Sequence, residues 1–405
     1  MHQRSVFRVG ASLLIASLAL SSCGSRGGTS TGTSDTNKTA TIGVMAPFSG
    51  NLSSLGLGIQ HSVELAVSQA NASKAIPGWT LKVKPIDDEG KPDVGKNAAT
   101  QFAGDPTVAG VVGNLNSSVA QSTQPVLSTA KIVQVSPANT NPSLTKGAKF
   151  ATAPARTYPT YFRTCTTDSV QGPFAARYLF QKANIKKVAT IHDKKTYGQG
   201  LVGAFAAEFT KLGGTVTAAE TINPDDSNFQ AVISKVKPTA PQAVFFGGEF
   251  PQAGPLSQQM KAAGLKVPLM GGDGIYDPKY IALAGATATG DLATNVGAPA
   301  DSLPAGKTFL ADYEKAGYKD PAAAYGAYSF DAANAIINAL KVSLKDAKDV
   351  VSTRQATIDA LGKVSFEGVS GKVAFDKYGD SITRVLTVYK AASGKWVPIN
   401  TEAFK

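Results

Sequence analysis

The chain has 405 residues and a formal net charge of +11 at pH 7, with three histidines and two cysteines. This length exceeds what one hydrophobic core usually supports, so we expect two lobes. The lysines are scattered without a basic stripe or interleaved aromatics, which argues against a nucleic-acid partner. So few histidines exclude a histidine-rich metal site, and two cysteines leave no disulfide framework.

Residues 1–22 have the pattern of an export signal. Two arginines form a basic head, and an apolar run (ASLLIASLAL) that is too short to cross a bilayer follows. Cys23 then stands where bacterial lipoproteins are cleaved and lipid-modified; the alternative is a plain secretory signal with an incidental cysteine. We therefore expect a lipid anchor on Cys23, a flexible tether over 23–39, and a location on the extracytoplasmic face of the cell membrane.

From residue 40, short β-branched runs alternate with helical patterns. This alternation predicts parallel sheets covered by helices on both faces, and the length fits two such sheets. The expected strands are 41–44, 80–86, 108–112, 132–135, 187–191, 215–221, 243–246, 267–270 and 291–296. The expected helices are 58–72, 93–103, 117–130, 169–183, 198–212, 228–237, 251–264, 278–285, 302–316, 322–342 and 351–362. A strand at 372–375 and a hairpin of 384–391 with 395–399 close the chain.

The motifs of catalysis are missing from this sequence. It contains no GxSxG elbow and no phosphate-binding loop, and Gly56-Leu57-Gly58 lacks the third glycine of a dinucleotide fingerprint. After signal removal only His61 and His192 remain, and neither stands in a nucleophile–base pattern. We expect no enzymatic activity, no catalytic residue, no cofactor and no metal, and we expect Cys165 to be a buried apolar residue.

The polar features sit at the carboxyl ends of predicted strands, where open parallel sheets bind ligands. A glycine turn after strand 108–112 runs into a helix that begins near Ser117. Its hydroxyl and the free amides of a helix N-terminus suit a carboxylate, although simple N-capping is the alternative. The loop 136–140 (SPANT) follows the next strand. Tyr197 and Asp273 occupy strand-exit loops of the second half.

From about residue 40 to its end, the chain resembles the leucine/isoleucine/valine-binding proteins, the receptors of ATP-binding-cassette amino-acid importers. The resemblance rests on motifs that occur in a matching order: SPANT at 136–140, RT at 163–164, DS at 168–169, QGP at 171–173, HDK at 192–194, YGQG at 197–200, FGG at 246–248, AAGL at 262–265 and MG at 270–271.

The resemblance implies the periplasmic binding protein type I fold. This is an α/β fold of two lobes, each with a parallel sheet flanked by helices, joined by three hinge crossovers. Lobe 1 would hold 40–165 and 296–373, and lobe 2 would hold 166–295 and 374–405. The implied function is capture of a small amino-acid-like ligand by a monomer that delivers it to permease and ATPase subunits. Branched-chain aliphatic amino acids are the default ligand.

The resemblance also implies which residues bind the ligand carboxylate. Ser117 and the loop residues Ala138, Asn139 and Thr140 would hold it through backbone amides and hydroxyls.

Asp273 would hold the ligand ammonium, and Tyr197 and Tyr325 would wall the side-chain pocket. Two positions depart from the family pattern, because Leu55 replaces an aromatic at the rim and Glu249 stands where leucine-type receptors carry an aromatic. Glu249 would either serve a ligand with extra donors or positive charge, or point to solvent, or pair with a lysine.

Two alternatives remain open. The chain could be a ligand-sensing receptor of the same fold that feeds no transporter, or it could import an amide or a cationic amino-acid-like solute. An enzyme is the third and least supported class.

Overall fold

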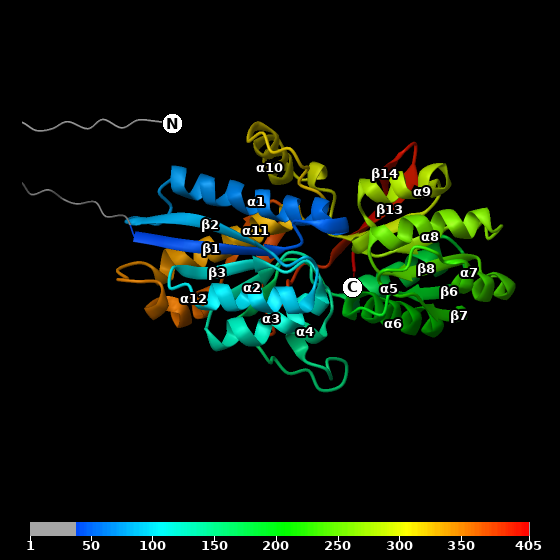
Figure 1. Ribbon diagram of the computed structural model, residues 1–405, viewed down its shortest axis with the longest axis horizontal. Helices are drawn as coiled ribbons and strands as arrows, with labels where there is room; N and C mark the ends of the chain where they lie inside the picture. Colours follow the sequence, from blue (N-terminus) through cyan, green and yellow to red (C-terminus); the bar gives the residue numbers. More distant parts are fainter. Residues whose placement is uncertain (1–37, 405) are drawn as a thin grey trace, which may run out of the picture. The chain divides into compact units, whose positions relative to one another are not determined.

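The computed structural model describes residues 38–404. The expected export signal, the lipid-bearing Cys23 and most of the tether lie outside this range. Within it the chain forms two large sheets, and we call each sheet with its helices a lobe (Figure 1). No helix within this range is long and apolar enough to span a membrane.

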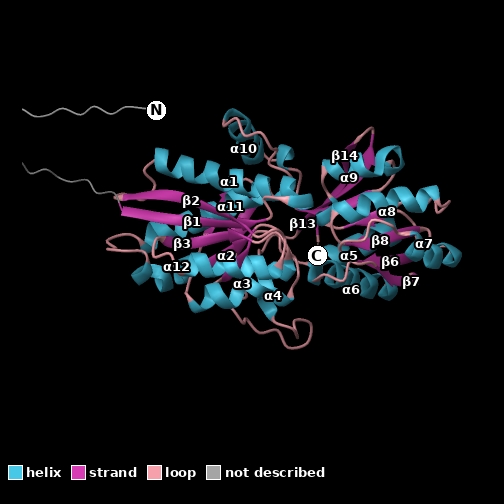
Figure 2. Ribbon diagram, in the orientation of Figure 1, coloured by secondary structure: helices cyan, strands magenta, loops and turns pink. Residues whose placement is uncertain are grey.

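The sheet of lobe 1 has the strand order β2-β1-β3-β4-β5, and all of its pairings are parallel. Helices α1 and α11 pack together, and α2 packs with α3, so that both faces of the sheet are covered (Figure 2). The strands are β1 Lys38–Ala46, β2 Trp79–Asp87, β3 Val108–Gly113, β4 Val133–Ser136 and β5 Tyr161–Arg163. The helices are α1 Ser53–Ala72, α2 Pro92–Ala103, α3 Ser117–Thr129, α4 Ser143–Lys146, α10 Pro304–Lys315, α11 Gly326–Ser343 and α12 Arg354–Leu361.

The sheet of lobe 2 has the order β14-β13-β10-β9-β8-β6-β7. Its strands are β6 Lys187–His192, β7 Thr215–Thr221, β8 Ala243–Gly247, β9 Leu269–Gly271, β10 Leu292–Val296, β13 Val385–Ala392 and β14 Lys395–Ala403. Its helices are α5 Asp168–Arg177, α6 Thr196–Lys211, α7 Gln230–Val236, α8 Phe250–Ala262 and α9 Pro278–Ala284.

The lobe 2 sheet is mixed rather than purely parallel. The predicted C-terminal hairpin is present, and its first strand joins the sheet edge by running antiparallel to β10. The two-residue turn makes β13 and β14 antiparallel to each other. A hairpin that joins a parallel sheet therefore adds at least one antiparallel strand to it.

Each predicted strand and helix is found, with ends shifted by a few residues. Two short strands were not predicted: β5, and β11 Ser365–Gly368, which pairs with β12 Gly371–Ala374 in a small separate sheet. The predicted helix 169–183 ends as α5 at Arg177 and continues as one π-helical turn, Tyr178–Lys182.

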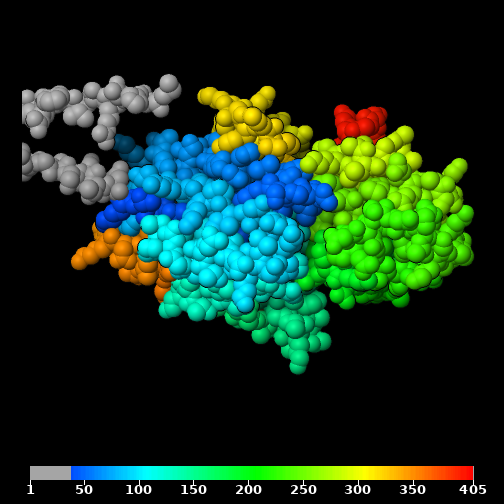
Figure 3. Space-filling model, viewed as in Figure 1, coloured from blue at the N-terminus to red at the C-terminus, as the bar shows by residue number. Residues whose placement is uncertain are grey.

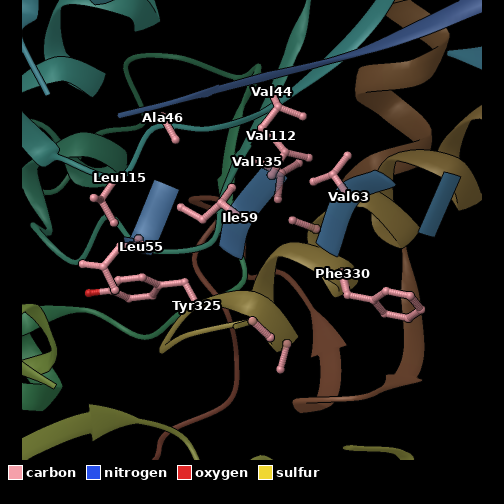
Figure 4. Close-up of a cluster of buried hydrophobic side chains, with 14 of the residues drawn as sticks. Val44, Ala46, Leu55, Ile59, Val63, Val112, Leu115, Val135, Tyr325 and Phe330 are labelled. Atoms are coloured by element: carbon pink, nitrogen blue, oxygen red, sulfur yellow. The ribbon is translucent and has the colours of Figure 1, made fainter. Parts of the chain in front are cut away.

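The core of each lobe forms around its central strands. All residues of β3 and of β8 are buried, as expected for strands covered on both faces. The largest apolar cluster contains residues of both lobes, and its lobe 1 part reaches the edge that faces lobe 2, where Leu55, Leu115 and Tyr325 lie near one another (Figure 4). The core therefore supplies a rigid apolar wall to that edge.

The chain crosses between the lobes three times: after β5, after β10, and between β12 and β13. A buried ion pair ties the first crossing to the third. The guanidinium Nε of Arg163, which is fully buried, lies 2.9 Å from Asp380 Oδ1, and Lys146 Nζ lies 2.8 Å from Asp380 Oδ2. Burial alone would raise the pKa of Asp380, but the charges of Arg163 and Lys146 hold it below its ordinary value.

We expect Arg163→Met to lower the free energy of unfolding by about 3–5 kcal/mol, because it leaves the buried Asp380 with one cation instead of two. Chemical denaturation measures the change. Lys84→Met is the control, since the Lys84–Asp105 pair is partly exposed and we expect its loss to cost about 1 kcal/mol or less. Equal effects in the two variants would contradict a role of Arg163 in holding the crossings together.

Candidate ligand-binding site

The carboxyl ends of both sheets face each other, and the loops that leave these strand ends form one site. On the lobe 1 side, α3 begins after β3, and a loop follows β4. On the lobe 2 side, α6 follows β6, α8 follows β8, and a 3₁₀ turn at Asp273–Ile275 follows β9. The lobes touch along this edge in the view of Figure 3. Converging strand ends are the usual ligand site of an α/β sheet.

These loops enclose a small cavity. Seven of the nine predicted binding residues line it, together with Leu115, Asn116 and Gly274; the seven are Leu55, Ser117, Ala138, Tyr197, Glu249, Asp273 and Tyr325. The space open to the centre of a water-sized sphere is about 20 Å³, which suits one or two water molecules. The lobes must therefore move apart for a larger solute to enter.

Asp273 is the buried charge of this cavity. Its carboxylate accepts hydrogen bonds from Gln171 Nε2 (2.8 Å) and the Tyr197 hydroxyl (2.8 Å) at Oδ1, and from the Tyr325 hydroxyl (3.0 Å) at Oδ2. No Lys, Arg or His of residues 38–404 pairs with it. Burial raises the pKa of Asp273, while these three donors lower it. A cation brought in by a ligand would complete the site.

A second buried acid stands beside Asp273. Asp168, the first residue of α5, is fully buried, and its pKa is raised to about 8 by burial and by the charge of Asp273. The hydroxyl of Thr140 and the amide of Gln171 partly oppose this rise. Since a pKa of about 8 keeps Asp168 largely protonated at neutral pH, Asp273 is the negative charge on the lobe 2 side of the cavity that no cation of residues 38–404 balances.

Ser117 faces this acidic side from lobe 1. It is 2% exposed and is the first residue of α3, whose N-terminal amides carry partial positive charge. The N-cap is Asn116, which makes no side-chain capping bond, and the Ser117 hydroxyl has no partner among residues 38–404. The capping interpretation of Ser117 is thus not supported, and the hydroxyl is available to a ligand.

Asn139 and Thr140 do not line the cavity in this arrangement. Both are fully buried behind it. The Asn139 side chain donates to Leu115 O (2.8 Å) and accepts from the Tyr161 hydroxyl (3.0 Å), while Arg163 donates to its backbone carbonyl. These bonds order the loop that presents Ala138, so Asn139 shapes the wall from behind. Thr140 O accepts a hydrogen bond from Asp168 N (2.8 Å).

Glu249 is buried and does not point to solvent. It pairs with Lys195 through Oε2 and accepts a hydrogen bond from Asn116 Nδ2 (2.9 Å) through Oε1. Lys195 also lies 3.2 Å from Asp193 Oδ2, and the neighbouring charge of Glu249 adds to burial in raising the pKa of Asp193 to about 7. Of the options considered for Glu249, the structure shows the lysine pair.

The bond between Asn116 and Glu249 joins the two lobes. Four further bonds do the same: Tyr325 to Asp273 as above, the Ser54 hydroxyl to Asp277 (3.2 Å), the Asn141 amide to Thr196 O (2.8 Å), and the Thr196 hydroxyl to Gln121 Oε1 (2.9 Å). The described arrangement is therefore closed.

Gln171, Lys195 and Asn116 were not among the predicted site residues. Gln171 belongs to the QGP motif, but the motif did not indicate that its side chain donates a hydrogen bond to Asp273. The glycines at 272 and 274 were also missed. A Cβ at Gly272 would lie 2.4 Å from the Tyr197 hydroxyl and one at Gly274 would lie 2.8 Å from Tyr197 Cε1, so both glycines let the ring reach Asp273. No metal-binding cluster of His, Cys, Asp or Glu occurs within residues 38–404.

Comparison with known proteins agrees with this geometry. Residues 39–395 match a family model described as periplasmic binding protein. The chain belongs to this family. It is 33% identical over 360 residues to "Leu/Ile/Val-binding protein homolog 3" of Brucella melitensis, covering 88% of this chain and 92% of that protein. The resemblance to the leucine/isoleucine/valine-binding proteins is thereby confirmed.

Solved structures confirm the periplasmic binding protein type I fold. The branched-chain amino acid transporter substrate-binding protein LivJ from Streptococcus pneumoniae, in complex with isoleucine, matches with a TM-score of 0.77 and 26% identity over 89% of this chain and all of that one. A solute-binding protein of an ABC transporter from R. palustris, in complex with benzoate, matches with a TM-score of 0.78 and 23% identity over 90% and 97% of the chains. Members of this family are extracytoplasmic, substrate-binding receptors.

The raised pKa values predict that a cationic ligand releases protons on binding. An ammonium beside Asp273 favours the charged carboxylates, so it should lower the pKa of Asp168 from about 8 and should lower that of Asp273. The affinity for an amino acid should therefore rise as the pH increases from about 5 to 8. Calorimetry in buffers of different ionisation enthalpy measures the released protons.

Asp168→Asn should reduce this proton release and flatten the pH dependence of the affinity. The control is Asp331→Asn, because the pKa of Asp331 is also raised by burial, to about 6, but its carboxylate is bound to the 369–370 backbone, outside the cavity lining. Proton uptake on binding would contradict the assignment of a cation beside Asp273.

Proposed function

We propose that this chain is the extracytoplasmic receptor of an ATP-binding-cassette importer. It captures an α-amino acid between its lobes and delivers it to a permease, while lipid on Cys23 anchors it to the membrane. The observation that carries the amino-acid assignment is the fully buried Asp273 carboxylate, which is bonded by neutral donors and by no cation of residues 38–404. A buried carboxylate of this kind is stabilised by a cation, which the ligand ammonium supplies.

The ligand carboxylate is assigned to the opposite wall. The Ser117 hydroxyl and the N-terminal amides of α3 supply donors there, and the adjacent amide of Ala138 already shares a bond with the Ser136 hydroxyl at 3.2 Å. Placing the carboxylate on lobe 1 and the ammonium on lobe 2 makes one ligand bridge both lobes. Its binding energy would then favour the closed arrangement.

A branched-chain aliphatic side chain is the default. Leu55, Leu115 and the ring of Tyr325 form the apolar part of the lining (Figure 4). Because Lys195 neutralises Glu249, the wall carries no second free charge that would require a cationic side chain. The names of the relatives and the isoleucine in the LivJ complex support the same class.

An aromatic acid such as the benzoate of the R. palustris protein suits this site less well. It has a carboxylate and no ammonium, so Asp273 would stay buried without a cation. Burial of an unpaired charge is strongly unfavourable.

The test is Asp273→Asn, which keeps the side-chain shape and removes the charge. We expect the dissociation constant for leucine, isoleucine or valine to rise by a factor of about 100 or more, since the ammonium loses its buried partner. Isothermal titration of the refolded chain measures it, with Asp331→Asn as the matched control. An unchanged dissociation constant would remove Asp273 from the site.

Ser117→Ala tests the carboxylate side. We expect a loss of about 1–3 kcal/mol in binding free energy, the usual cost of removing a hydrogen bond to a charged group. Ser118→Ala, the adjacent substitution outside the cavity lining, should leave binding unchanged. If both variants bind as tightly as the wild type, the hydroxyl of Ser117 does not contact the ligand.

A further inference from the structure

A second cavity, larger than the first, lies at the second crossing between the lobes. We call it the hinge pocket. It offers about 260 Å³ to the centre of a water-sized sphere. Its walls come from both lobes: Tyr276 and the hairpin residues Tyr389 and Trp396 belong to lobe 2, while Tyr328 lies on α11 of lobe 1. The chain just after β10 contributes Asp301.

Aromatic rings form one wall of the hinge pocket. The rings of Tyr276 and Tyr389 are 4.2 Å apart between centroids, and those of Tyr276 and Trp396 are 6.1 Å apart. The indole of Trp396 donates to the backbone carbonyl of Asp277 at 3.0 Å, which fixes the orientation of its ring. Clustered aromatic faces attract organic cations.

Two side chains that line the pocket are more than nine-tenths buried, and each has one polar atom without a hydrogen-bond partner among residues 38–404. Asn295 is 8% exposed; its Oδ1 accepts from Val296 N, but its amide nitrogen has no partner among residues 38–404. Tyr328 is 7% exposed, and its hydroxyl likewise has no partner within that range. Neither atom is sealed from solvent, so both open into the pocket, where they can bond to a ligand or to water.

The charged residue of the pocket indicates whether its ligand is a cation or an anion. Asp301 is the one charged side chain in the lining, and it forms no ion pair with residues 38–404. It lines the same pocket as Tyr276, Tyr389 and Trp396, and it is exposed to solvent. A carboxylate beside aromatic faces favours a cation over an anion.

We propose that the hinge pocket is a second ligand site, which binds a small organic cation bearing an alkylated ammonium group. The ammonium lies against the rings of Tyr276 and Trp396, with Asp301 as its counter-charge. The amide of Asn295 and the hydroxyl of Tyr328 bond to polar atoms elsewhere in the ligand or to the waters that accompany it.

The two cavities share two short segments of chain. In the first segment, Asp273 lines the first cavity and Tyr276, three residues later, lines the hinge pocket. In the second segment, Tyr325 lines the first cavity and Tyr328 lines the hinge pocket. A cation in the hinge pocket therefore contacts segments that also form the amino-acid site. Its binding does not depend on an amino acid being present.

Tetramethylammonium chloride is the probe, titrated calorimetrically into the refolded chain against sodium chloride at equal ionic strength. We expect saturable binding of tetramethylammonium only, weakened about two- to fivefold in Asp301→Asn, as an exposed charge pair implies. Asp359→Asn is the control, because Asp359 is exposed on α12 and outside the pocket, and it should bind as the wild type does. The fluorescence of Trp396 in a Trp79→Phe background should change with the same midpoint.

The same titration in Asp273→Asn separates this site from the amino-acid site. Unchanged tetramethylammonium binding in that variant places the probe in the hinge pocket, whatever the variant does to amino acids. Three results would overturn the proposal: absence of saturable binding, equal affinity in wild type and Asp301→Asn, or a loss confined to Asp273→Asn, which would place the cation in the first cavity.

Discussion

The arrangement of this protein depends on one buried charge. Asp273 lies at the end of a lobe 2 strand, bonded by Gln171 and Tyr197 of its own lobe and by Tyr325 of the other. Neutral hydrogen bonds lower the cost of burying a carboxylate, but they do not cancel its charge. A cavity that closes over such a group is stable when a cation enters with the ligand. The same interaction accounts for the preference for an ammonium, for closure, and for the proton release expected on binding.

Closure of the two lobes requires bending at the three crossings between them. Buried contacts connect these crossings to the ligand site. Arg163 links Asp380, in the third crossing, to the carbonyl of Asn139, in the loop that carries Ala138. The closed arrangement itself is held by few bonds between the lobes, such as Asn116 to Glu249. Since each hydrogen bond contributes about 1 kcal/mol net, a ligand that bridges both walls can decide the balance between open and closed lobes.

Much of this could be predicted from the sequence, because strand and helix periodicity is local. The strands and helices, and the convergence of strand-end loops, follow from that pattern. The three-residue strand β5 was too short to predict, and the direction in which the hairpin joins lobe 2 depends on a crossing that no local pattern encodes. The pairing of Glu249 with Lys195 was left open because it depends on distances between loops. The burial of Asn139 and Thr140 behind the cavity could not be predicted for the same reason.

The central claim is that the ligand ammonium neutralises Asp273. The most direct test uses unaltered protein and altered ligands: titration with leucine, isoleucine and valine, with the matching acids that lack the amino group, and with benzoate. The account predicts binding of one or more amino acids and a loss of at least a hundredfold in affinity when the ammonium is removed, as expected for an unpaired buried charge. Equal or tighter binding of the acids that lack an ammonium would contradict it and would place this receptor with those that take aromatic or aliphatic carboxylates.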